Sequence, residues 1–185
     1  QFPNLDREKI RQTSEIISRQ VNHMTGLIDD LLDVSRVSRG LVTLDEELLD
    51  ARQIINSAVE QVRPFIDSRK HRLTLHTSPQ SGYIKGDYKR LVQILSNVLS
   101  NAAKYTPEGG EIIMSMDLTE SDVVFTVRDN GIGISANVIA HIFELFVQAE
   151  RTSDRTQGGL GIGLALVKNL VHLHGGKVTA HSAGH

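Results

Sequence analysis

The sequence predicts an α+β fold, a two-layer α/β sandwich in which helices cover one face of a mixed sheet, preceded by one long helix. Amphipathic helical segments are interleaved with short alternating segments. Two of the alternating segments, 111–118 and 122–128, follow each other across a tight turn, which is typical of paired antiparallel strands. At 185 residues the chain can bury one good core and a smaller appendage.

The composition argues against several classes of function. The formal net charge is -2, so no basic field indicates nucleic-acid binding. The chain contains no cysteine, which excludes disulfides and thiolate metal sites. No apolar run approaches the roughly 18–20 residues of a membrane span, and no signal peptide opens the sequence. Because QFPNLD has no initiator Met and SAGH follows a predicted strand directly, we expect a fragment of a longer protein. The lack of cysteine and of a membrane span leads us to expect that this fragment is soluble and cytoplasmic.

Residues 6–38 predict one long helix. Its seam positions recur at spacings of four and three, and further apolar residues widen that seam into the face of a bundle helix. The seam consists of Ile10, Ser14, Ile17, Val21, Met24, Ile28, Leu31 and Ser35. One helix cannot bury such a face alone, so a partner helix is implied. Gly40 is placed to end the helix, which divides the chain into 1–40 and 41–185.

The second part alternates helices and strands. Pro64 should kink or shorten its first helix, Asp87 should cap the second, and Ser135 should cap the third. The predicted helices are 50–70, 90–105, 136–143 and 160–173, and the predicted strands are 41–45, 71–76, 83–85, 111–118, 122–128 and 177–181. Segment 147–159 is polar and predicts a mobile loop or lid.

Helix 90–105 carries two neighbouring stripes. One is apolar and consists of Leu91, Leu95, Val98 and Ala102. The other holds amides, a cation and an aromatic ring instead of ordinary surface charges, and consists of Gln93, Asn97, Asn101, Lys104 and Tyr105. Amide oxygens suit a hard metal ion, a cation suits phosphate, and an aromatic ring offers its face to a base. The second stripe therefore predicts a binding site.

Asp129 ends a predicted strand and begins the segment DNGIG. A buried Asp there can accept a hydrogen bond from an exocyclic amine, which would select adenine over guanine. The glycines of the segment allow the backbone to approach a ligand closely. Considered alone, the segment is more simply an ordinary Asp-Asn-Gly turn.

The segment GGLGIGLAL sets Gly159, Gly161 and Gly163 at a helix start. Free N–H groups and the helix dipole favour phosphate there, and a flexible hinge is the alternative. The glycine spacing and the polar loop before it exclude a dinucleotide fingerprint. No P-loop, HRD or DFG motif is present, so the chain is neither a P-loop protein nor an ordinary protein kinase. His172 and His174 point apart on a helix and do not predict a zinc site.

In this order, the segments resemble one family. This family is the catalytic ATP-binding domain of two-component sensor histidine kinases, which has four motifs called the N, G1, F and G2 boxes. Their counterparts here, in that order, are SNVLSNAAKYT, DNGIG, IFELF and GGLGIGL. That domain has the Bergerat fold of the GHKL-type ATPase superfamily. The second helix of the dimerisation and phosphotransfer domain is resembled by ISRQVNHMTGLIDDLLDVSR. The resemblance implies that 1–40 is part of that helical bundle and that 41–185 is the catalytic domain.

The resemblance also implies a ligand, Mg·ATP, and roles for the helix residues that match. It assigns Mg²⁺ coordination to Asn101, with Asn97 lining the same site. It assigns phosphate contact to Lys104, and it places Tyr105 against the nucleotide.

The resemblance further assigns the adenine amine to Asp129, with Gly131 and Gly133 shaping the adenine pocket. A last group of residues would close over the phosphates. This group comprises Gly159, Leu160, Gly161, Ile162, Gly163 and Leu164.

The activity implied is that of a bacterial protein-histidine kinase. It would transfer the γ-phosphoryl of ATP to a histidine, which would relay it to an aspartate of a response-regulator receiver domain. The parent protein would be a homodimer through its helical bundle, with anchoring in the inner membrane as one arrangement. No phosphoacceptor box is present, and His23, followed by MTGLIDD, belongs to the second bundle helix. The acceptor is therefore expected upstream of Gln1, and this fragment should not phosphorylate itself.

Two alternatives stay open. An ATP-hydrolysing relative would use a Glu to activate water at the position that Asn97 occupies, as the resemblance implies, and an amide cannot act as a general base. A nucleotide-sensing or inactive scaffold of the same fold, with the long helix pairing subunits, would need no turnover at all.

Overall fold

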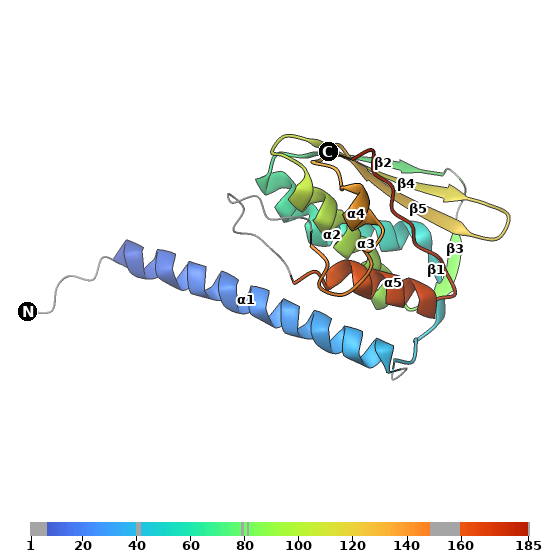
Figure 1. Ribbon diagram of the computed structural model, residues 1–185, viewed down its shortest axis with the longest axis horizontal. Coiled ribbons are helices and arrows are strands. Elements are labelled where there is room, and N and C mark those ends of the chain that lie inside the picture. Colours follow the sequence, from blue (N-terminus) through green and yellow to red (C-terminus); the bar gives the residue numbers. More distant parts are fainter. Residues whose placement is uncertain (1–6, 40–41, 79, 81, 149–159, 185) are drawn as a thin grey trace, which may run out of the picture.

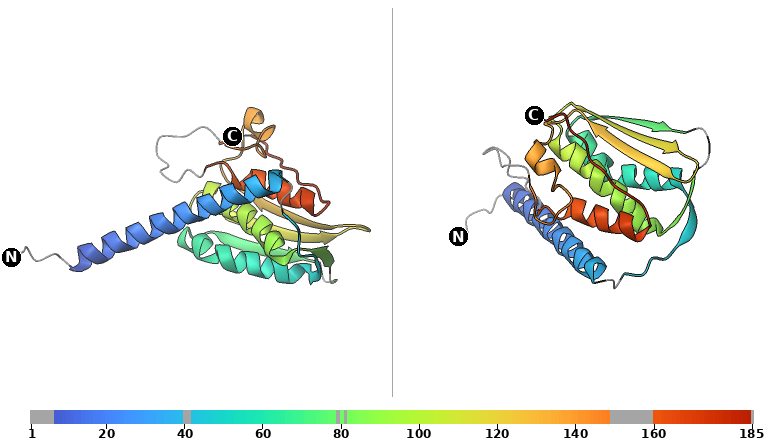
Figure 2. Two further views of the ribbon diagram at one scale, coloured as in Figure 1. Left: turned by 90° about the horizontal axis from the view of Figure 1, so that it is seen from below. Right: turned by 45° about the vertical axis from the view of Figure 1, so that its right-hand side comes forward.

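The computed structural model describes residues 7–39, 42–78, 80, 82–148 and 160–184. Its first element is α1 (Arg7–Ser38), a single helix of 32 residues, about 48 Å long at 1.5 Å per residue. The predicted helix is confirmed. Figures 1 and 2 show α1 passing beside α5 near its C-terminal end while its N-terminal half projects away from the rest of the chain. Gly40, the predicted helix end, lies outside the described residues.

The heptad face of α1 is largely uncovered. Ile17, Met24 and Ile28 are each more than half exposed, although they lie on the apolar side of the helix. Val34, near the C-terminal end, is by contrast 4% exposed and joins the main core. Most of the seam therefore remains available to another helix.

The first predicted strand is wrong in its position. The structure has no strand at 42–45, and β1 instead covers Glu47–Asp50. Its partner is β3 (Tyr83–Gly86), which runs antiparallel to it with Leu49 opposite Ile84. Leu49 is buried at 7% exposure, so the burial of this side chain and the pairing with β3 fix the position of β1. The sequence pattern of 41–45 did not indicate a strand to pair with.

Helix α2 (Ala51–Ser68) follows β1 directly. The Asp50 carboxylate caps it by accepting a hydrogen bond from the Arg52 backbone N–H. Pro64 does not shorten the helix as predicted, because α2 continues to Ser68. The carbonyl that loses its usual N–H partner is that of Glu60, an exposed residue, where water can replace the missing donor.

The main sheet has three strands, β2 (Arg72–Thr77), β4 (Glu111–Leu118) and β5 (Val123–Asp129), in the order β2-β4-β5. β2 and β4 are parallel, and β4 and β5 form the predicted antiparallel pair. The connection from β2 to β4 contains α3 (Tyr88–Tyr105). Figure 1 shows α2 and α3 lying against the same face of the sheet. The predicted two-layer arrangement with a mixed sheet is therefore confirmed.

Helix α4 (Ala136–Ile139) is shorter than predicted and does not reach Phe143. The Ser135 side chain makes no cap hydrogen bond, and its carbonyl accepts from the Val138 and Ile139 N–H groups instead. Beyond α4 the chain continues in tight turns, for example from the Glu144 N–H to the His141 carbonyl. Such hydrogen bonds, from the N–H of residue i to the carbonyl of residue i−3, replace the i to i−4 bonds of an α-helix.

Helix α5 (Gly163–Leu173) begins later than the predicted residue 160. Gly161 has a φ of +72°, which an α-helix cannot contain. Gly175 has the same φ value and ends the helix as predicted, with its N–H donating to the His172 carbonyl.

Segment 177–181 does not form the predicted strand. The alternation in this segment predicts which side chains turn inward, and Val178 does pack against the core. A strand also needs a neighbouring strand to pair with, which alternation alone does not provide. Among the described strands, β5 pairs with β4 alone. In the part of the chain that the structure describes, no helix is long and apolar enough to cross a membrane.

Candidate functional site

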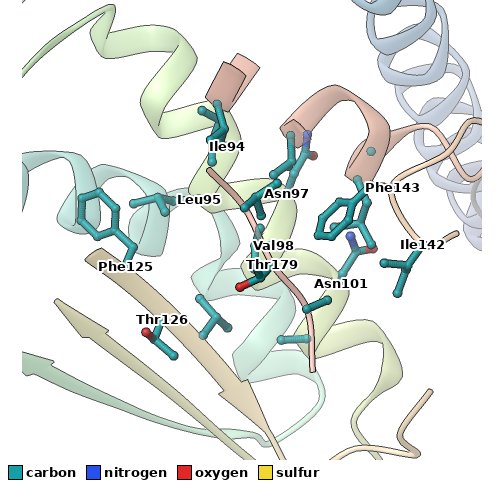
Figure 3. Close-up of a pocket in the computed structure, with 18 of the residues that line it drawn as sticks. Ile94, Leu95, Asn97, Val98, Asn101, Phe125, Thr126, Ile142, Phe143 and Thr179 are labelled. Atoms are coloured by element: carbon teal, nitrogen blue, oxygen red, sulfur yellow. The ribbon is translucent and has the colours of Figure 1, made fainter. Parts of the chain in front are cut away.

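Asn97 and Asn101 lie one turn apart on α3, half-buried, and line one wide cleft. Figure 3 shows both amides on the side of the cleft that carries Ile142 and Phe143. The Asn97 Nδ2 is buried and has no hydrogen-bond partner among the described residues. A buried unpaired donor costs about 1–3 kcal/mol. Such a group fits a site that a ligand completes.

Gln93 belongs to the same polar stripe but does not line the cleft. Its Nε2 donates to Asp33 Oδ2 of α1 at 3.0 Å, and Arg90 Nη1 donates to the same oxygen at 2.6 Å. The residues of this stripe therefore have two roles. Gln93 contacts α1, and only the residues from Asn97 onward face the cleft.

Burial raises the pKa of the Asp33 carboxyl, but the opposing effects are together larger. Hydrogen bonds from Arg90 and Gln93 and the positive charge of Arg90 hold that pKa below its ordinary value. The carboxyl side chain is 15% exposed and the Arg90 side chain 25%. The pair is thus shielded from water more than an ordinary surface ion pair. No local pattern in the sequence indicated this contact between residues far apart along the chain.

Lys104 and Tyr105 end α3 at the same cleft. The Lys104 Nζ lies 5.1 Å from the centroid of the Tyr105 ring, within reach of a cation–π interaction. The Tyr105 carbonyl accepts the Ile132 N–H at 3.2 Å. This bond ties the C-terminal end of α3 to the loop that follows β5.

Asp129 stands at the end of β5 and lines the cleft, but it is exposed and not buried as expected. No described strand pairs with the outer edge of β5. Its Oδ1 accepts the Gly131 N–H at 2.9 Å. A Cβ at Gly131 would lie 2.6 Å from that oxygen and 2.7 Å from the Tyr105 carbonyl oxygen. Only glycine fits this turn.

Gly133 has a φ of +72°, and a Cβ there would overlap the Gly184 carbonyl. In the same loop, the Ile134 N–H donates to Ser182 Oγ at 2.9 Å. The loop after β5 is thus held against the C-terminal segment. Both Gly131 and Gly133 line the cleft.

The start of α5 forms another wall of the cleft. A Cβ at Gly161 would lie 2.6 Å from the Val147 carbonyl oxygen, and the Gly161 carbonyl accepts the Phe146 N–H at 3.0 Å. Among the described residues no side chain caps α5, so its first N–H groups suit an anion. A Cβ at Gly163 would be 3.9 Å from the Asn97 Cγ, which places the start of α5 beside the amide stripe.

The neighbours of these glycines differ in exposure. Leu160 is 42% exposed at the cleft, whereas Ile162 is 2% exposed. Leu164 is half-buried and also lines the cleft. Gly159 and most of the predicted lid lie outside the described residues. Apart from Gln93, which contacts α1, and Gly159, which lies outside the described residues, the structure brings the predicted site residues to one cleft.

Comparison with known proteins identifies the family. Residues 86–184 match the family described as "Histidine kinase-, DNA gyrase B-, and HSP90-like ATPase". This match covers more than half of the chain. The chain belongs to this family. The resemblance seen in its motifs is thereby confirmed.

Relatives of this ATPase family member include sensor kinases. The chain is 36% identical over 178 residues to the circadian input-output histidine kinase CikA of Thermosynechococcus vestitus, covering 94% of this chain and 24% of that protein. It is 28% identical over 170 residues to the sensor histidine kinase WalK of Bacillus subtilis, covering 90% of this chain and 28% of that protein. The chain thus spans only a minor part of these relatives.

Solved structures agree on the fold of this ATPase domain. Full-length ShkA in complex with AMPPNP superposes with a TM-score of 0.74 at 27% identity, covering 93% of this chain and 36% of that chain. The histidine kinase AdeS of Acinetobacter baumannii gives a TM-score of 0.70 at 23% identity, covering 86% of this chain and 72% of that chain. The fold is that of histidine kinase catalytic domains.

Two histidine contacts of this ATPase domain have no counterpart in the motifs. His71, 7% exposed, lies within hydrogen-bond distance of the Ala103 carbonyl through Nε2, at 2.9 Å. His174 is bonded through both ring nitrogens, so neither nitrogen is free for a metal. No group of three or more His, Cys, Asp or Glu side chains suited to a metal ion occurs within the described residues. His23 lies in α1, but its side chain is outside the described part.

Proposed function

We propose that this chain binds Mg·ATP in the cleft and presents the γ-phosphoryl group to a histidine outside the chain, as the ATP-binding catalytic part of a sensor histidine kinase. The observation that supports this most is the convergence of Asn101, Lys104, Asp129 and the start of α5 on one cleft. These groups offer, respectively, an amide oxygen, a cation, a carboxylate and free backbone N–H groups. That combination suits a metal-bound nucleotide triphosphate.

We propose that the adenine end lies by Asp129. Its second carboxylate oxygen would accept the exocyclic amine, while the turn through Gly131 and Gly133 leaves room for the ring. Tyr105 would lie against the nucleotide. Guanine would present a carbonyl to the same carboxylate and be rejected.

The phosphate end would lie between α3 and α5. Lys104 would contact phosphate, and the backbone of 159–164 would close over it. Asn101, with Asn97 beside it, would hold Mg²⁺ through its amide oxygen, with phosphate and water oxygens as the remaining ligands. When bound, that ion would neutralise charge on the phosphates. The chain mainly positions groups, because the attacking imidazole is itself the nucleophile.

We propose that 1–40 is the second helix of a dimerisation and phosphotransfer bundle and that 41–185 is the catalytic domain. The half-exposed seam of α1 supports a bundle partner, and two copies of the parent protein would supply it as a homodimer. A receiver domain of a response regulator would then accept the phosphoryl group from the histidine. The uncharged Asn97, where a hydrolytic relative needs a base, argues against steady ATP hydrolysis.

Calorimetric titration with Mg²⁺ and the non-hydrolysable analogue AMPPNP tests this proposal. We expect micromolar binding, about -8 kcal/mol, for the wild type. Asp129→Asn should abolish it, because an amide presents an N–H₂ group as well as an oxygen to the adenine amine. The matching GTP analogue serves as the control ligand and should not bind. Absence of AMPPNP binding to the wild type would refute the proposal and favour the scaffold alternative.

A further inference from the structure

His174 forms the C-cap of α5 and hydrogen-bonds through both ring nitrogens. The Asp87 backbone N–H donates to Nε2 at 3.0 Å. Nε2 is therefore the acceptor, and Nδ1 carries the proton that it donates to the Leu170 carbonyl at 2.8 Å. The imidazole is thus fixed to its own helix on one side and to α3 on the other.

The partner of this imidazole starts the helix that carries the amide stripe. Asp87 is the N-cap of α3, and its Oδ1 accepts the Arg90 N–H at 3.2 Å. The side chain thus caps α3 while the backbone N–H of the same residue bonds to His174. A shift of His174 would therefore act directly on the first turn of α3.

The start of α5 meets the middle of α3 at the cleft. A Cβ at Gly163, the first residue of α5, would lie 3.9 Å from the Asn97 Cγ. α3 and α5 consequently run antiparallel, with His174 at one end of the contact and the glycine segment at the other. α5 has 11 residues, so the two ends are about 16 Å apart. Sliding α5 by one residue would move its start about 1.5 Å along the amide stripe.

Packing leaves the imidazole little freedom. A Cβ at Gly86 would lie 2.7 Å from the His174 Cδ2 and 2.9 Å from the Leu91 Cδ1. Gly86 is itself buried. The ring therefore fills a space that the neighbouring glycine keeps open.

We propose that His174 is a positioning residue that sets the register of α5 against α3, and so places Gly161 and Gly163 relative to Asn97 at the phosphate end of the cleft. The proposal rests on the proposed nucleotide site for its functional consequence. Its structural part, the register of the two helices, is independent of any ligand. The two parts can be tested separately.

The first test compares two substitutions by AMPPNP titration with Mg²⁺. His174→Leu removes the acceptor and leaves the Asp87 N–H unpaired, and we expect about tenfold weaker binding, equivalent to about 1.4 kcal/mol. His174→Gln can keep an acceptor oxygen near the Nε2 position and should stay within about threefold of the wild type. In both variants the Leu170 carbonyl still accepts a hydrogen bond from the backbone N–H of residue 174.

Two further variants control for general loss of stability. Leu173→Ala removes packing from the same turn of α5 but leaves the Asp87 bond in place, so its affinity should remain near that of the wild type. Gly86→Ala leaves His174 unchanged but displaces the ring, so it should weaken binding as His174→Leu does. Equal affinity losses in Leu173→Ala and His174→Leu would overturn the proposal.

The second test needs no ligand. The chain has no cysteine, so spin labels at Lys89→Cys and Lys168→Cys, both exposed sites on α3 and α5, report one interhelical distance. We expect the distance distribution to shift or broaden in His174→Leu and to return to the wild-type distribution in His174→Gln. Identical distributions in all three proteins would overturn the register role, even if the wild type failed to bind nucleotide.

Discussion

At the scale of single residues, the cleft depends on positions that tolerate only one side chain. Asp129 and Gly131 are an example, because they constrain each other. Asp129 Oδ1 accepts the Gly131 N–H, which fixes the carboxylate in orientation, and a Cβ at Gly131 would lie 2.6 Å from that oxygen. The sequence predicted the presence of the carboxylate but not its exposure, since exposure depends on contacts with residues far away along the chain.

Gly131→Ala should therefore weaken Mg·AMPPNP binding by about tenfold or more. The added Cβ would lie 2.6 Å from Asp129 Oδ1, so the carboxylate must turn away or the loop must move. Calorimetric titration measures the effect. Gly26→Ala is the matched control, because a Cβ there meets nothing within 4 Å. It should leave the affinity unchanged and stabilise α1 slightly. Unaltered binding in Gly131→Ala would contradict the assigned adenine pocket.

At the scale of elements, α3 is held at both ends by residues outside its own sequence. Its first turn is tied to Asp33 and His174. Its last turn is held by a hydrogen bond between His71 and the Ala103 carbonyl. The periodicity of the apolar stripe was sufficient to predict the helix. It could not predict these contacts, because none of them is local.

His71→Leu should lower the free energy of unfolding by about 1–3 kcal/mol, because it leaves a buried carbonyl acceptor at the end of α3 without its donor. His71→Gln can place an amide N–H near the position of Nε2 and should lose less than about 1 kcal/mol. Urea denaturation of the three proteins gives both values. Equal losses in the two variants would mean that the imidazole acts by its volume and not by its hydrogen bond.

The boundaries of the other elements show where local pattern stops being informative. The start of α5 was predicted too early because Leu160 continues the apolar character of the helix that follows, whereas the positive φ of Gly161 excludes that residue from an α-helix. The strand expected at 41–45 lies at 47–50 because β3 pairs there. The segments 111–118 and 122–128 were predicted almost to the residue, since a strand pair across a tight turn is a local feature.

At the scale of the whole molecule, α1 is joined to the domain through Asp33, Arg90 and Gln93. Because the folded state lowers the pKa of Asp33, the stabilisation it provides is complete above the ordinary value of 3.8. That stabilisation is lost as the pH falls through the lower pKa of the folded protein. The attachment of α1 should therefore weaken in acid.

Asp33→Asn should lower the free energy of unfolding at pH 7 by about 1–2 kcal/mol, because a charge-assisted bond becomes a neutral one. Below the ordinary pKa of the carboxyl, the difference from the wild type should shrink toward zero as both side chains become uncharged. Denaturation at several pH values measures this. Glu15→Gln is the control, since its pair with Arg11 on the same helix is 4.0 Å long and exposed. A difference that does not depend on pH would contradict the role of the charge.

The parallel pairing of β2 with β4 has a consequence for how the protein acquires its cleft. These strands can meet only after the chain between them, which contains β3 and α3, has closed into a loop. Closing a long loop slows folding, because its entropy is lost before the non-local contacts compensate for it. The ligand-lining helix therefore lies inside this loop. We expect newly made chains to lack a complete cleft until the loop has closed.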